Sequence, residues 1–296
     1  MKKTNKQTVI TTTVTILILN LALSVLKLAI GLLARSAALV ADAAHSFSDV
    51  LGTIIVITGV KLGGKQADRS HPYGHERLES AASLILSAVV LITGIMLGYD
   101  AIMQIIYGAG GDFVVPGAIA LAAVVITVAA KEGMYRYTRA ASKKTGSSSL
   151  MALAWDQRSD VMSSIGAFVG ILGARFGLPI LDPIAAVVIS LLIIRVAINI
   201  FRDAMRKMID TSAGDELEDE IRAVALDVTG VISIDELKTR LFGDRVYVDI
   251  EIGIDGDISL YEAHHTAQLV ENAVSGSFTQ VKSCMVHVNP IEDPRR

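Results

Sequence analysis

The sequence has 296 residues, of which 52% are hydrophobic and 19% are charged. These proportions favour an integral membrane protein with a soluble portion over a soluble enzyme. Residues 1–209 hold 20 Lys and Arg against 12 Asp and Glu, whereas residues 210–296 hold 7 against 18. This shift predicts a transmembrane domain over 1–209 and a cytoplasmic domain over 210–296. The single cysteine, Cys284, excludes an intramolecular disulfide.

Apolar segments dominate the first part of the chain. Each is long enough to cross ~30 Å of hydrocarbon at ~1.5 Å per residue. The segments lie at about 9–33, 38–62, 79–106, 114–139, 149–174 and 181–204. We therefore predict an all-α, six-helix transmembrane bundle.

Basic residues between these segments predict the orientation of the chain. Three alternate connections, at 33–37, 107–113 and 175–180, carry only Arg35 and Arg175. The opposite side of the membrane receives the N-terminus, the other connections and most basic residues, and is therefore predicted to be cytoplasmic. These residues are Lys2, Lys3, Lys6, Lys61, Lys65, Arg69, Arg77, Lys131, Arg136, Arg139, Lys143, Lys144, Arg202, Arg206 and Lys207. Because cytoplasmic loops are enriched in Lys and Arg, both termini are expected on the cytoplasmic side of a cell (plasma or inner) membrane.

The residues after 210 have the pattern of a small α+β domain. An acidic start and spaced apolar residues predict a helix over 215–228. Strands are predicted over 231–241 and 245–254, joined by a turn at Gly243 and Asp244. Ser259 and Glu262 form a capping-box pattern for a helix to about Val274, and residues 282–288 alternate as a last strand. The order αββαβ predicts an open sheet with its helices on one face.

Ionisable residues interrupt two of the apolar segments. His45 and Asp49 lie four residues apart in the second segment, and Asp156 and Asp160 repeat that spacing in the fifth. Residues four apart share one face of a helix, and charge inside a membrane persists only where it faces protein or a wet cavity. Imidazole and carboxylate groups suit a divalent transition metal.

Two interpretations of these pairs remain open. The four residues bind a metal or protons together, or each pair makes an isolated polar contact that stabilises helix packing. Matched pairs at comparable depth favour the metal or proton site. Asp42 shares the face of His45 but lies nearer the end of its segment, so we expect it to orient His45 or line a hydrated cavity.

The connection between the second and third segments has a separate cluster. Asp68, His71 and His75 lie around Pro72 and Gly74, and three such groups in a tight loop are a plausible three-ligand metal site. The alternative is a loop with surface histidines and no metal.

These motifs resemble those of the cation diffusion facilitator family of six-span, proton-coupled divalent metal exporters. The similarity covers essentially the full chain and includes Asp42-Ala-Ala-His45-Ser-Phe-Ser-Asp49, His71-Pro-Tyr-Gly-His75 and Trp155-Asp156-Gln-Arg-Ser-Asp160. The resemblance implies a V-shaped homodimer with a ferredoxin- or metallochaperone-like cytoplasmic domain. It also implies that His45, Asp49, Asp156 and Asp160 form the transport site, and that Asp68, His71 and His75 form a loop site.

The same resemblance implies two further features. Family members similar to the zinc and iron exporters bind metal in the cytoplasmic domain, at positions that match Asp235, Glu251, His264, His287 and Asn289, with His265 adjacent. Two expected histidines are acidic here, which indicates a weaker, oxygen-rich site or none. The resemblance also implies that Arg77 and Asp210 form an ion pair that interlocks the dimer.

The predicted function is export of a divalent metal in exchange for protons. Because three carboxylates and one imidazole form a hard ligand set, Mn²⁺ is favoured, with Zn²⁺ and Fe²⁺ close behind. We expect no organic cofactor and no nucleic-acid partner, and partners limited to the lipid bilayer, protons and a second copy of the chain. A nucleotide-binding glycine loop is absent, which argues against an ATP-driven pump. A divalent-cation channel and a membrane metal sensor remain alternatives.

Overall fold

The computed structural model describes residues 3–63, 68–108, 113–242 and 245–291. The predicted turn at Gly243 and Asp244 lies outside these ranges. Two compact units divide the chain: a helical unit, Met1–Val56 with Ile85–Ile200, and a mixed unit, Ile57–Leu84 with Phe201–Arg296. The long helices are α1 (Lys3–Leu33), α2 (Ala37–Gly63), α3 (Arg77–Gly108), α4 (Ala118–Thr145), α5 (Ser148–Arg175) and α6 (Leu181–Met208).

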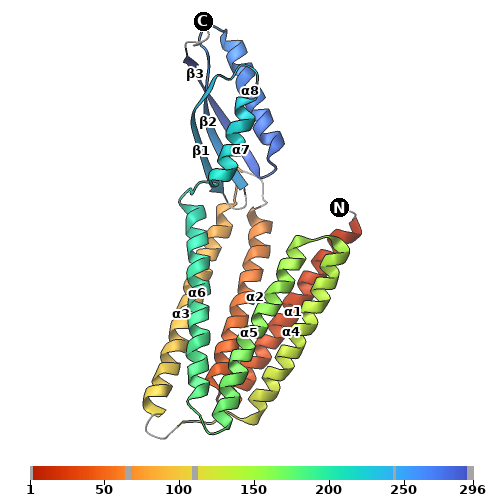
Figure 1. The fold of residues 1–296 in the computed structure, drawn as a ribbon, viewed down its shortest axis with the longest axis vertical. Helices are drawn as coiled ribbons and strands as arrows, with labels where there is room; N and C mark the ends of the chain where they lie inside the picture. The colour runs from red at the N-terminus through yellow and green to blue at the C-terminus, as the bar shows by residue number, and fades with distance from the viewer. Residues whose placement is uncertain (1–2, 64–67, 109–112, 243–244, 292–296) are drawn as a thin grey trace. The chain divides into compact units, whose positions relative to one another are not determined.

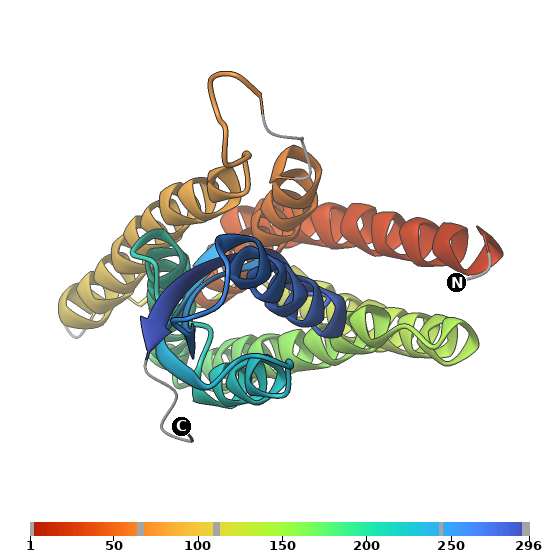
Figure 2. The same cartoon turned by 90° about the horizontal axis from the view of Figure 1, so that it is seen from above.

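Five of these six helices are long and apolar enough to cross a membrane, by length and composition: α1, α2, α3, α4 and α6. In the described part of the chain, α5 does not meet that composition, since it carries Asp156, Arg158 and Asp160. It packs closely against α4, and α4 also packs against α1 (Figures 1 and 2). The predicted helical transmembrane bundle is confirmed, and the helix that falls short of this composition is the one that carries two candidate ligands.

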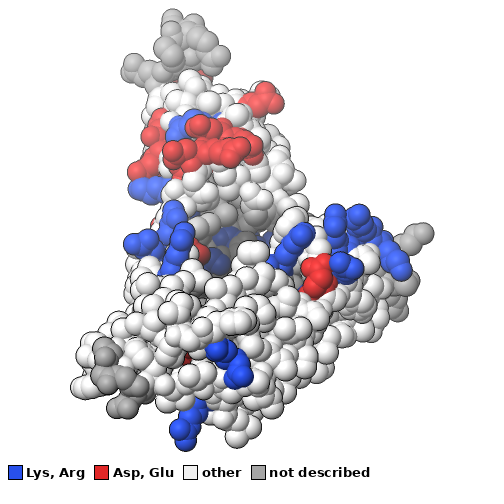
Figure 3. Space-filling model, turned by 60° about the horizontal axis from the view of Figure 1, so that its bottom comes forward, with Lys and Arg blue, Asp and Glu red and all other residues white. Residues whose placement is uncertain are grey.

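Large apolar side chains on the helical unit point outward. Ile85, Ile92 and Met96 of α3 are 69%, 57% and 61% exposed, and Val169 of α5 is 58% exposed. Figure 3 shows one face of the molecule, on which charged side chains are sparse over much of the helices. Lipid tails replace water around such a surface, so the exposed apolar side chains fit a membrane environment.

The helix α2 is held in place at its first turn. Asp182 of α6 accepts hydrogen bonds from Ser36 Oγ at 2.6 Å and from the amide of Ala37 at 2.7 Å. The first amides of a helix have no partner inside the helix, and a carboxylate there also interacts favourably with the helix dipole. Arg35, with φ of 53°, makes the sharp turn that precedes α2. These contacts fix the start of the helix that carries His45 and Asp49.

The small domain has the predicted order. Its elements are α7 (Asp215–Leu226), β1 (Ser233–Phe242), β2 (Arg245–Asp255), α8 (Leu260–Ser277) and β3 (Val281–Ile291). The strand β2 is central, antiparallel to β1 and parallel to β3. Alternate residues of β2 from Val246 to Ile254 are buried in one core with Ile221 of α7 and Val270 of α8. Both helices therefore cover the same face of the sheet (Figure 1), and the capping box of Ser259 and Glu262 begins α8 as predicted.

Burial makes the thiol of Cys284 unreactive. Cys284 lies in β3 with 5% of its surface exposed, and burial, with the charges of Glu271 and Asp249, raises the pKa of its thiol to about 12. Because only the thiolate reacts, we expect the native chain at pH 8 to react with a maleimide more than about 100-fold more slowly than a chain unfolded in SDS. As this is the only cysteine, the labelling rate reports it alone. Equal rates in the two states would contradict its placement.

Candidate metal centre

A cluster of three metal-binding groups lies between α2 and α5. One ligand atom each from His45, Asp49 and Asp160 lies within 4.8 Å of the others. His45 and Asp49 are one turn apart on α2, so both project from the same face of that helix. Asp160 reaches the cluster from α5 and is only 5% exposed. An imidazole and two carboxylates at this separation suit a divalent transition metal.

Two ligand atoms of this cluster have no partner within the described residues. The Nδ1 atom of His45 and the Oδ2 atom of Asp49 are buried and accept or donate no hydrogen bond. An unsatisfied buried polar atom costs free energy, and native proteins keep few of them. A cation bound between these atoms would satisfy both at once.

Asp156 lies outside this group of three. It is one turn before Asp160 on α5 and its side chain is exposed, and among the described residues the 4.8 Å group holds only His45, Asp49 and Asp160. Its role as a fourth ligand stays a prediction, which requires a small movement of α5 or of the Asp156 side chain.

A buried lysine of α4 contacts the cluster. Lys131 is 1% exposed, and its ammonium donates to Asp160 Oδ2 at 2.5 Å, Asn20 Oδ1 at 2.7 Å and Gln157 Oε1 at 3.3 Å. Three acceptors match the three donors of an ammonium group. The placement of Lys131 among the cytoplasmic basic residues is therefore wrong. Its position inside the apolar segment 114–139 was the signal that it faces the protein interior.

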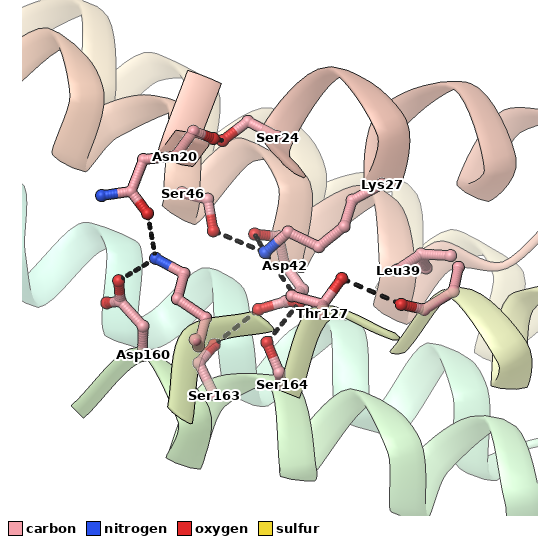
Figure 4. Close-up of polar contacts among 12 residues, drawn as sticks. Asn20, Ser24, Lys27, Leu39, Asp42, Ser46, Thr127, Asp160, Ser163 and Ser164 are labelled. Atoms are coloured by element: carbon pink, nitrogen blue, oxygen red, sulfur yellow. Dashed lines mark hydrogen bonds and ion pairs between the residues drawn. The ribbon is translucent and has the colours of Figure 1, made fainter. Parts of the chain in front are cut away.

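A second buried lysine, Lys27 of α1, holds Asp42. Its ammonium donates to Asp42 Oδ2 at 3.0 Å and to Ser46 Oγ at 2.5 Å (Figure 4). Ser163 and Ser164 of α5 donate to the same carboxylate at 3.1 and 2.9 Å. Asp42 thus joins α1, α2 and α5 through a buried ion pair and hydroxyl groups.

This network does not include His45, which Asp42 was expected to orient; the other expected role, lining a hydrated cavity, stays a prediction. The contacts found for its carboxylate in the described part of the chain are with Lys27, Ser163 and Ser164, not with His45. A buried carboxylate needs a countercharge and hydrogen bonds, and Lys27 supplies the charge. Lys27 lies within the first apolar segment. A charged residue inside a membrane span is expected to face protein or a wet cavity, and this principle, used above for His45, could have identified Lys27 as well.

The loop after α2 gathers the second predicted cluster, in the mixed unit. One ligand atom each from Asp68, His71 and His75 lies within 4.8 Å of the others. Asp68 lies 3.4 Å from His71 Nδ1 through Oδ1 and 3.4 Å from His75 Nε2 through Oδ2. His75 is buried, and its Nδ1 has no partner among the described residues. The donor set and spacing fit a divalent metal.

The same loop is fastened to the sheet of the mixed unit. The hydroxyl of Tyr247 donates to the carbonyl of Tyr73 at 3.2 Å, and Lys282 donates to that carbonyl at 3.1 Å. Lys282 also forms an ion pair with Glu76. Arg77 and Asp210 form an ion pair at 2.5 Å within one chain, and Arg77 lies 5.0 Å from the centre of the Phe242 ring. These contacts fix the backbone around the loop histidines.

Part of the set expected to bind metal in the cytoplasmic domain lies together around Asn289, without forming a three-ligand group among the described residues. Asn289 donates to Asp235 Oδ2 at 2.9 Å and to Glu251 Oε2 at 3.2 Å, and the hydrogen bond from Asn289 lowers the pKa of Asp235. His287 is paired with Glu251 across β2 and β3, and His264 is exposed on α8. Within the described ranges, no three His, Cys, Asp or Glu groups of this domain meet the 4.8 Å separation. The amide at Asn289 occupies the space between the carboxylates.

The fold and these clusters indicate the class of protein: a membrane protein with candidate metal-binding groups on its helices. Residues 13–209 match the family model of the cation efflux transmembrane domain, and residues 213–291 match that of the cation efflux protein cytoplasmic domain. The chain therefore belongs to the cation diffusion facilitator family of metal exporters, which are transporters and not enzymes. The second match, to a dimerisation domain, supports a homodimer.

Several relatives are similar to this chain over most of their length. The chain is 31% identical over 249 residues to the magnetosome protein MamB of Magnetospira sp. (strain QH-2), covering 84% of each. It is 30% identical over 253 residues to the manganese efflux system protein MneP of Bacillus subtilis (strain 168), covering 83% of this chain and 84% of MneP. For the manganese efflux system protein MneS of the same organism, the identity is 32% over 250 residues, covering 83% of each. A cadmium form of a MamM CTD variant covers 26% of this chain and 95% of that chain, at 27% identity and a TM-score of 0.26.

Proposed function

We propose that the protein exports a divalent transition metal from the cytoplasm in exchange for protons. His45, Asp49 and Asp160 bind the metal, and Asp156 completes the site during transport. The observation that carries this proposal is the cluster between α2 and α5, in which the buried atoms His45 Nδ1 and Asp49 Oδ2 have no partner among the described residues. Ionisable groups inside a membrane helix mark ion pathways by default.

Coupling to protons follows from the chemistry of the ligands. Carboxylate and imidazole groups must lose their protons to coordinate a metal, so metal binding releases protons and protonation releases metal. With access alternating between the two sides of the membrane, this competition exchanges one species for the other. His45 is the proposed principal proton carrier, since the ordinary pKa of histidine, ~6.5, lies nearest physiological pH.

Mn²⁺ is the proposed substrate, with Zn²⁺ and Fe²⁺ as weaker candidates. One imidazole among carboxylates is a harder ligand set than the sets that favour Zn²⁺. The two Bacillus subtilis relatives are manganese efflux proteins by name, which supports the same choice. Affinity alone follows the Irving–Williams order, so selectivity must be measured as transport.

The proposed arrangement in the cell is a homodimer in the plasma or inner membrane with both termini in the cytoplasm. The basic residues that remain on the connections support this orientation. Arg77 and Asp210 stabilise the dimer at the membrane surface. The loop cluster of Asp68, His71 and His75 binds a second metal ion beside the cytoplasmic domain.

Purified protein in liposomes with an internal pH dye tests the proposal. We expect external Mn²⁺ to enter the vesicles through the protein molecules whose cytoplasmic side faces the external solution. Because protons leave in exchange, the internal pH should rise. Zn²⁺, Fe²⁺, Co²⁺ and Cd²⁺ are compared under the same conditions, and protein-free vesicles are the control. Metal uptake without a pH change would indicate a channel. An absence of uptake for all five metals would refute a transport function.

A further inference from the structure

The position of Lys131 suggests a role beyond helix packing. Its ammonium lies 2.5 Å from Oδ2 of Asp160, the carboxylate that lies with His45 and Asp49 in the candidate metal cluster. We propose that Lys131 is a built-in cation that competes with the transported metal for Asp160, which keeps metal binding weak enough for release. This inference rests on the proposed function, because it assumes that Asp160 binds the transported ion.

The geometry makes Lys131 an opponent of the metal in either binding mode. A metal bound to Oδ2 of Asp160 must displace the ammonium from that atom. A metal bound to Oδ1 shares the carboxylate with the ammonium, and metal–oxygen bonds of ~2.0–2.2 Å then hold the two cations close enough to repel. Repulsion between like charges is strong where water is scarce. The side chains of Asp160 and Lys131 are 7% and 1% exposed, so little water screens them.

Two acceptors outside the metal cluster give the ammonium a place to remain when the metal holds Asp160. Asn20 Oδ1 accepts from Lys131 at 2.7 Å and Gln157 Oε1 accepts at 3.3 Å. Neither residue belongs to the group of three candidate ligands. Lys131 therefore loses one hydrogen bond and keeps two as the metal binds. It returns to Asp160 when the metal leaves, which stabilises the empty site.

Lys27 lacks this relation to the cluster and provides a matched control. It is also 1% exposed and also ion-paired, but its carboxylate is Asp42, which lies outside the metal-binding group among the described residues. Removing either lysine breaks one buried ion pair. Only the removal of Lys131 is expected to free a candidate ligand.

The test measures KM and kcat of Mn²⁺ transport in proteoliposomes. It compares the unmodified protein with Lys131→Met, Lys27→Met and Asn20→Leu. Each kcat is normalised to the folded fraction, which size-exclusion chromatography gives. Lys131→Met should lower KM by about tenfold or more and lower kcat, because the metal binds more tightly and leaves more slowly. Lys27→Met should keep KM within about threefold of the unmodified protein, since Lys27 contacts Asp42 and Ser46 and none of the three candidate ligands among the described residues. Asn20→Leu should raise KM, because the ammonium loses its alternative acceptor and holds Asp160 more firmly.

The opposite signs separate competition from a structural role. If Lys131 only holds α4 against α5, then Lys131→Met and Asn20→Leu both raise KM or leave it unchanged, and the proposal is overturned. Lys131→Gln repeats the first measurement if the methionine variant does not fold, and an Asn20→Leu variant whose KM does not rise overturns the proposal by itself. If the unmodified protein transports no metal, the proposed function fails first, and that result is distinct from an unchanged KM in an active transporter.

Discussion

Asp49→Ala should abolish Mn²⁺-driven proton exchange in proteoliposomes. The Asp49 carboxylate lies in the cluster with His45 and Asp160, and its Oδ2 is one of the two buried ligand atoms that lack a partner among the described residues. Removing it leaves the metal with fewer protein ligands and removes a negative charge. Mutation of residues that only hydrogen-bond to metal ligands typically costs about 10–100-fold in metal affinity or activity. For the loss of a ligand itself we therefore expect the transport rate at fixed Mn²⁺ to fall by more than about 100-fold.

A matched substitution controls for the loss of a carboxylate from a long helix. Asp100→Ala removes an exposed carboxylate of α3 that lies outside the cluster, and it should transport Mn²⁺ at nearly the normal rate. Asp49→Asn keeps the size of the side chain and should be as inactive as alanine, because an amide cannot supply the negative charge. Normal proton flux in Asp49→Ala would refute the assignment of the site.

Asp42→Ala should destabilise the helical unit by about 3–5 kcal/mol, the range observed when one partner of a buried ion pair is removed. The side chain of Lys27 is 1% exposed, and its ammonium loses its only ion-pair partner in the described chain. Ser46 Oγ and the carbonyl of residue 42 remain as acceptors, but neither carries a charge. The free energy of unfolding in mixed detergent micelles with increasing SDS measures the effect.

The double variant Lys27→Met/Asp42→Leu distinguishes a buried ion pair from a general packing defect. Removing both charges should restore most of the stability, because no uncompensated charge remains in the bundle and apolar groups replace the pair. Asp203→Ala, at an exposed position of α6, should change the unfolding free energy by less than about 0.5 kcal/mol. If the double variant is as unstable as the sum of the single variants, the ion pair is not the cause.

Local patterns in the sequence were sufficient for the elements of the fold. Runs of apolar residues predicted the helices from α1 to α6, strand-like runs on either side of a turn predicted β1 and β2, and alternation predicted β3. Helical periodicity placed His45 and Asp49 on one face, because residues four apart always share a face. These properties depend on neighbours within one element, and the chain itself fixes that spacing.

Contacts between elements needed the tertiary structure. The sequence could not show that Lys131 reaches Asp160 on α5, or that Lys27 pairs with Asp42, since helix periodicity says nothing about the rotation and depth of one helix against another. Asp156 and Asp160 share a face of α5 by the same periodicity, yet only Asp160 lies within 4.8 Å of the α2 ligands. The sequence alone thus determined the helices, the small domain and the types of metal-binding groups. Packing decided which of those groups meet and which cations compete for them, because a buried charge takes its partner from whichever helix faces it.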